Sequence, residues 1–116
     1  MSIQINQQLF MPRLKEWCET RRQRYEDNSV DLGREVLEEA QGWFDLEPWK
    51  SGRTEHFDTK RECRIELKRH IMKKVDLNDM SRSYFVPSFV WTWIAHQVIT
   101  YIVKLIIDTY WEDIPT

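Results

Sequence analysis

The C-terminal third of the chain constrains the fold more than any other feature. From Ser88 to about Trp111 the sequence contains no glycine, no proline and no charged residue before Lys104. Nothing in this stretch interrupts a helix, and Pro115 lies beyond its end. The stretch is also far longer than a typical strand. We therefore predict one long apolar helix over residues 88 to 111 and expect the rest of the fold to be built around it.

A polar seam runs along this predicted helix. On a helical wheel its positions recur every four residues and drift slowly round one side. They are Thr92, His96, Thr100, Lys104 and Asp108, with Gln97 beside them. The apolar arc covers more than half of the circumference, which is wider than the ~100° stripe of an ordinary surface helix. Other helices of the chain can wrap this arc, and part of it can contact a second copy or another protein; the two explanations are compatible.

A membrane span is a third explanation of the same helix. Its length is suitable, because about 20 residues cross a bilayer. However, His96 and Gln97 would lie near the middle of the bilayer, where polar groups are costly. Lys104 and Asp108 are one helical turn apart and form a pair suited to water or to a polar groove. We do not expect integral insertion, and membrane association remains only an alternative.

Two helices are predicted near the N-terminus. Pro12 suits the first position of a helix, and we predict a helix from Pro12 to about Asp27. Residues 31 to 44 carry an apolar stripe with helical spacing and form the second predicted helix. Residues 1 to 11 are expected to form an extended arm, and the polar residues 76 to 83 a connector.

The third predicted helix, over residues 60 to 75, has a rival. Thr59 and Glu62 match a capping box, and the segment is rich in residues of high helix propensity. However, apolar and charged residues alternate from Cys63 to Leu67, which is a strand pattern. We favour the helix, which makes the chain one all-α domain, a bundle of about four helices around the C-terminal helix. A strand at residues 62 to 68 would make the fold α+β.

Composition limits the function classes. The chain has 116 residues, of which 31% are charged and 41% hydrophobic, and its formal net charge is -2. This is a globular composition that points neither to nucleic acid nor to acidic partners as a whole. Cys18 and Cys63 form no C-x-x-C pair, and the first residues lack the features of a secretory signal. A reducing, cytoplasmic setting is therefore expected.

Motifs for catalysis or cofactor binding are absent from the sequence. The segment around Ser51 and Gly52 lacks the spacing of a phosphate loop. His56, Cys63 and His70 are evenly spaced, but on a helix Cys63 and His70 would be about 10 Å apart, too far to bind one metal ion. We expect no cofactor, no metal site and no enzymatic activity.

Aromatic residues direct the prediction of function. Six tryptophans in 116 residues supply a large apolar area, and Trp and Tyr dominate the energetics of interfaces. We predict a non-enzymatic interaction or structural protein that self-associates or binds a protein partner. Small, tryptophan-rich chains without motifs are common among accessory proteins such as those of bacteriophages. The predicted contact residues are Trp49, Trp91, Trp93, Tyr101 and Trp111.

The charge distribution supplies the alternative function. Residues 31 to 48 carry six acids and one base, whereas residues 50 to 74 carry nine bases and four acids. A basic helix can neutralise phosphates, so the alternative is a nucleic-acid-binding regulator. Its predicted contacts are Arg61, Arg64, Lys68, Arg69 and Lys73. A simpler explanation is that the acidic second helix pairs with the basic third helix.

Overall fold

The fold consists of helices throughout the part of the chain that can be described. A computed structural model describes residues 3–46 and 59–114, and within these residues it contains five α-helices, one 3₁₀ turn and no strand. The elements are α1 (Gln7–Thr20), α2 (Glu26–Phe44), α4 (Lys60–Lys74), α5 (Leu77–Ser83), α6 (Ser88–Tyr110) and the turn η1 (Trp111–Asp113). The predicted all-α fold is therefore confirmed.

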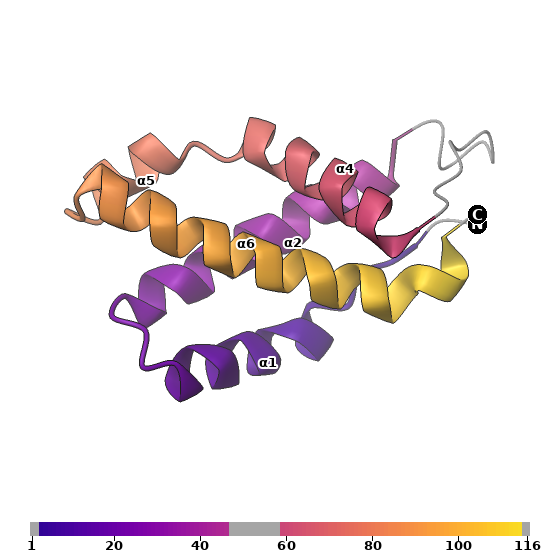
Figure 1. The fold of residues 1–116 in the computed structure, drawn as a ribbon, viewed down its shortest axis with the longest axis horizontal. Helices are drawn as coiled ribbons and strands as arrows, with labels where there is room; N and C mark the ends of the chain where they lie inside the picture. Colours follow the sequence, from indigo (N-terminus) through magenta and orange to yellow (C-terminus); the bar gives the residue numbers. More distant parts are fainter. Residues whose placement is uncertain (1–2, 47–58, 115–116) are drawn as a thin grey trace.

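Helix α6 is the centre of the bundle. It lies across the front of α2, with α4 along one side and α1 along the other, and α5 packs near its first turns (Figure 1). The residues that α6 buries are Trp91, Ile94, Ala95, Val98, Ile99, Ile102, Val103, Leu105, Ile106 and Ile107. The other helices thus wrap the long apolar helix, as its wide apolar arc predicts.

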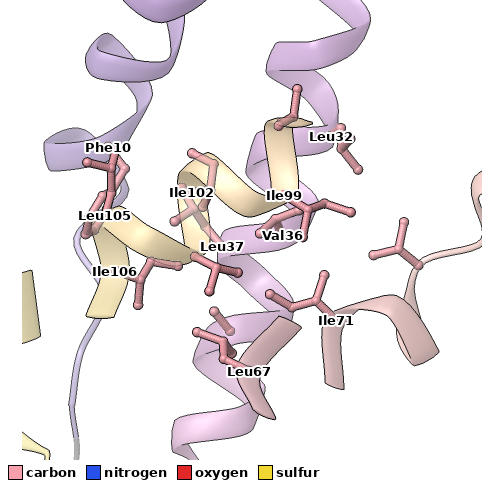
Figure 2. Close-up of a cluster of buried hydrophobic side chains, with 14 of the residues drawn as sticks. Phe10, Leu32, Val36, Leu37, Leu67, Ile71, Ile99, Ile102, Leu105 and Ile106 are labelled. Carbon is pink, nitrogen blue, oxygen red and sulfur yellow. The ribbon is translucent and has the colours of Figure 1, made fainter. Parts of the chain in front are cut away.

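Four helices, α1, α2, α4 and α6 itself, form the core around the middle of α6. Figure 2 shows Ile99, Ile102 and Ile106 of α6 among side chains of the surrounding helices. The neighbours are Phe10 of α1, Leu32, Val36 and Leu37 of α2, and Leu67 and Ile71 of α4. Burial of each such side chain contributes about 1.5–3 kcal/mol to folding. This packing leaves only the polar side of α6 available to a ligand.

Helix α1 begins earlier than the sequence predicts. Its N-cap is Asn6, whose Oδ1 accepts a hydrogen bond from the Gln8 N–H at 3.0 Å. Residues 7–11 are therefore helical and do not belong to an extended arm. Pro12 lies inside α1 and not at its first position, because the helix extends upstream to bury Phe10 in the core.

The break between α1 and α2 also lies upstream of the predicted one. α1 ends in a Schellman motif, in which the Gln23 N–H donates to the Cys18 carbonyl at 3.0 Å and Arg22 has a φ of 51°. Glycine is the usual residue at this left-handed position, so the arginine gives no sequence signal for a helix end. α2 consequently starts at Glu26, five residues before the predicted start.

Helix α4 matches the prediction for residues 60 to 75. The Thr59 side chain caps it by accepting a hydrogen bond from the Glu62 N–H at 3.2 Å. Cys63, Leu67 and Ile71 are spaced by one helical turn and are all buried. The strand alternative for residues 62 to 68 is therefore wrong.

The predicted connector 76–83 is mostly the helix α5. Asp76 caps this helix, since its Oδ1 accepts from the Asp79 N–H at 3.0 Å. α5 also ends in a Schellman motif, with the Val86 N–H donating to the Ser81 carbonyl at 3.0 Å. The left-handed position is occupied by Phe85, with a φ of 55°. α5 was missed because so short a helix buries only Met80 and Ser81 and shows no apolar stripe.

One described helix is long and apolar enough to cross a membrane. It is the segment Ser88–Asp113, and 56% of its most apolar window is buried inside the protein. The core helix of a globular domain can have the same length and composition. Such a core helix is buried by neighbouring helices, as this segment is.

Candidate interaction surfaces

The predicted contact residues differ widely in how much of each side chain is exposed. Trp91 is completely buried, and its ring meets that of Tyr84 edge-on with centroids 5.3 Å apart. It is therefore a core residue and not an accessible anchor. Trp93 is 64% exposed, whereas Tyr101 and Trp111 are partly buried against the core. Trp49 lies outside the described residues.

An aromatic ridge projects into solvent where α5 leads into α6. We use this name for Phe85, Phe89 and Trp93, which are 94%, 78% and 64% exposed. They are spaced by four residues, so Phe89 and Trp93 lie one turn apart on the same side of α6. The sequence prediction missed Phe85 and Phe89. The available signal was the helical wheel, which places Phe89 and Trp93 on the side of the polar seam.

The backbone conformation of Phe85 costs free energy that its exposed side chain does not recover by packing in the monomer. Its left-handed conformation costs an L-residue about 1–2 kcal/mol, and glycine is the usual choice at this position. A bulky side chain there gains almost nothing from packing, because it is almost entirely in water. Residues that are strained and poorly packed are candidates for a functional role.

The chain segment that carries the aromatic ridge is uncharged. No Asp, Glu, Lys or Arg occurs from Ser83 to Val103. The neighbouring Arg82 pairs with Asp79 of the same helix at 3.6 Å. A surface that approaches Phe85 and Phe89 would therefore meet no charge from this segment, whereas Trp93 lines a groove together with Arg21 and Lys104.

A first groove, the α1–α6 groove, lies along one side of the polar seam. It has a volume of about 500 Å³. Its walls contain a stacked pair of rings, Trp17 and Tyr101, with centroids 4.9 Å apart, and the Arg21 guanidinium lies 4.9 Å from the centre of the indole. The remaining lining residues are Trp93, His96, Gln97, Thr100 and Lys104.

A second groove, the α4–α6 groove, lies on the other side of the seam. It has a volume of about 210 Å³ and is lined by Arg61, Arg64, Ile65, Lys68, Thr100, Val103 and Lys104. The two helices are joined beside it by polar contacts. Lys68 Nζ donates to Thr100 Oγ1 at 2.9 Å, and Lys60 pairs with Asp108 at 3.6 Å.

The structure brings together only part of the predicted nucleic-acid face. Arg61, Arg64 and Lys68 line the α4–α6 groove. Arg69 instead pairs with Glu66 at 2.8 Å, and Lys73 borders a different depression near the start of α5. Two cations that the sequence prediction missed, Arg21 and Lys104, join the first three because α1 and α6 are adjacent only in the folded protein.

The acidic residues of α2 do not neutralise α4 through ion pairs. Among residues 3–46 and 59–114, the ion pairs of α4 are Lys60–Asp108 to α6 and Arg69–Glu66 within the helix. On α2, burial and then the charges of Glu38 and Glu39 raise the pKa of Glu35. Within the described residues, the α4 cations that line the α4–α6 groove therefore have no ion-pair partner on α2.

Neither cysteine is suited to nucleophilic chemistry. Both thiols are free and buried. Burial raises the pKa of Cys63 to about 12, and burial together with Glu26 and Glu19 raises the pKa of Cys18 to about 11. Both are protonated at neutral pH, whereas the thiolate is the reactive form. In the described part of the chain, no three potential metal ligands converge, and His56 lies outside that part.

In comparisons with protein-family models, curated proteins and solved structures, nothing matches this chain.

Proposed function

We propose that this is a non-enzymatic interaction protein that self-associates through the aromatic ridge. The observation that carries the proposal is the exposure of three large apolar side chains, Phe85, Phe89 and Trp93, where α5 leads into α6. Full burial of one large apolar side chain is worth about 1.5–3 kcal/mol, so three exposed rings are a substantial driving force for association. The free, buried cysteines support a reducing, cytoplasmic setting.

A second copy of the chain is the partner that best fits this surface. The ridge and its surroundings carry no charge between Ser83 and Val103. A two-fold symmetric contact brings the same patch of both copies together, so a patch of one charge sign would repel itself, whereas aromatic rings can pack on each other. The segment from Ser83 to Val103 therefore contributes no like charges to such a contact.

The expected complex is weak. Each ring can bury about 150–250 Å², so two ridges together would bury on the order of 1,000 Å². That area lies at the lower limit for specific interfaces. We expect a dissociation constant of roughly 10–100 µM, within reach of solution measurements.

Sedimentation equilibrium over about 5–500 µM protein, a range that brackets such an affinity, tests this proposal. The wild type should shift from monomer to dimer. The variant Phe85→Asn/Phe89→Gln should remain monomeric, since Asn tolerates the left-handed backbone and Gln suits a helix.

The matched control removes two exposed apolar side chains elsewhere. Leu9→Gln/Leu46→Gln changes residues that are about half exposed, at 50% and 45%, and lie outside the ridge. It should dimerise like the wild type. A wild type that stays monomeric throughout, or a control that loses dimerisation as fully as the ridge variant, would contradict self-association through the ridge.

A further inference from the structure

We propose that the α1–α6 and α4–α6 grooves form one continuous site for single-stranded nucleic acid. Thr100 and Lys104 line both grooves, so the two hollows meet on the polar seam of α6. Figure 1 shows α1 and α4 on opposite sides of α6. This site shares Trp93 with the aromatic ridge but includes neither Phe85 nor Phe89.

The joined grooves concentrate positive charge. Of the residues that the structure describes, five cations line them, namely Arg21, Arg61, Arg64, Lys68 and Lys104, and no carboxylate does. Within the described part of the chain, none of the five forms an ion pair. The chain as a whole has a formal net charge of -2, so this is a local concentration of cations. Such a track fits the phosphates of a nucleic-acid backbone.

Aromatic rings accompany these cations. Trp93 is exposed at the margin of the α1–α6 groove, and the Trp17–Tyr101 stack forms part of its wall. Unpaired bases stack on an exposed ring such as that of Trp93, whereas the bases of a duplex are already stacked on each other. His96 and Gln97 supply hydrogen-bonding groups between the rings and Lys104. Rings and cations together favour a single strand over a duplex or an acidic peptide.

The site has the length of a short oligonucleotide. From Trp93 to Lys104, α6 rises by about 16 Å. We expect contacts with about four nucleotides, the lower end of the range for small single-strand-binding modules.

The charge test measures fluorescence anisotropy of a labelled oligothymidylate of about 15 nucleotides at about 50 mM salt, where phosphate contacts are strong. Arg64→Glu/Lys104→Glu reverses two cations of the joined grooves and should weaken binding by about tenfold or more, and should also lower the salt slope by about 1.4. Arg69→Glu/Lys73→Glu makes the same change of charge outside the grooves and should weaken binding by less than about threefold. Equal losses for both variants would overturn the site.

The partner test uses Trp93→Ala and two competitors. Loss of base stacking should weaken oligothymidylate binding by about tenfold, and neither an unlabelled duplex nor polyglutamate should compete as well as the single strand. If polyglutamate competes equally and Trp93→Ala binds normally, the grooves bind acidic polypeptide and the proposal is wrong.

One variant separates this proposal from self-association. Phe85→Asn/Phe89→Gln should bind oligothymidylate as the wild type does, because both changes lie outside the grooves.

Discussion

The indole of Trp17 lies nearly parallel to the phenol ring of Tyr101, with their centroids 4.9 Å apart and their planes inclined by 15°. This stack joins α1 to the solvent side of α6 and forms a wall of the α1–α6 groove. The groove therefore depends on a contact between residues that are far apart in the sequence.

A double-mutant cycle measures this contact. We expect Trp17→Leu and Tyr101→Leu each to lower the free energy of unfolding, with a coupling between them of about 1 kcal/mol, the usual worth of an aromatic pair beyond its burial. Urea denaturation of the four proteins gives the coupling. Strictly additive effects would mean that the rings are adjacent without stabilising the fold.

Glycine at either left-handed helix end should stabilise the protein. Phe85→Gly and Arg22→Gly both relieve the strain of a positive φ, and each should raise the free energy of unfolding by about 1 kcal/mol. Thermal or urea denaturation measures this gain. Only Phe85→Gly should also weaken self-association, because Arg22 lies outside the ridge. A marked loss of stability in Phe85→Gly would show that the phenyl ring packs within the monomer.

The two glycines of α2 should respond in opposite directions to alanine. A Cβ at Gly33 would overlap the buried side chain of Leu14, whereas a Cβ at Gly42 meets nothing within 4 Å. Overpacking destabilises a core by about 1–3 kcal/mol, whereas the higher helix propensity of alanine stabilises α2 by about 1 kcal/mol. Gly33→Ala should therefore lower the free energy of unfolding by about 1 kcal/mol. Gly42→Ala should raise it by about 0.5–1 kcal/mol.

Urea denaturation compares the two glycine variants. Stabilisation by both substitutions would mean that α1 can move away from α2 at little cost. Destabilisation by both would mean that the exposed side of Gly42 is covered by something other than solvent.

The buried thiols predict how stability changes at high pH. Their pKa values in the folded protein, about 11 for Cys18 and about 12 for Cys63, exceed the ordinary value of 9.0. As the pH rises, the unfolded chain therefore loses the two thiol protons before the folded protein does. The contribution of the protonated thiols to the free energy of unfolding is present below about pH 9 and is lost as the pH rises toward 11 and 12. Urea denaturation at about pH 8 and about pH 10 should show the decrease, and Cys63→Ala should show a smaller one.

The same burial protects the thiols from reagents. In native buffer, Ellman's reagent should react with neither cysteine on the time scale on which it labels the urea-unfolded chain. Rapid labelling of the native protein would show that α1 or α4 opens readily.

Local sequence signals determined two helices correctly. α6 was predictable because an unbroken apolar run with a polar seam can satisfy its own backbone only as a helix, and its boundaries agree within one residue. α4 was predictable because Thr59 and Glu62 form a cap that depends on neighbouring residues alone.

Tertiary structure decided the features that carry the proposed functions. Arg22 and Phe85 follow the ends of their helices at positions where glycine is usual. The packing of the fold holds both residues in a left-handed backbone conformation that arginine and phenylalanine disfavour. Trp91 and Trp93 are the same residue type two positions apart, yet they point about 160° away from each other on α6. Neighbouring helices bury the first and leave the second exposed. The joined grooves exist for the same reason, since residue order cannot place Arg21, Arg64 and Lys104 side by side until α1 and α4 pack on α6.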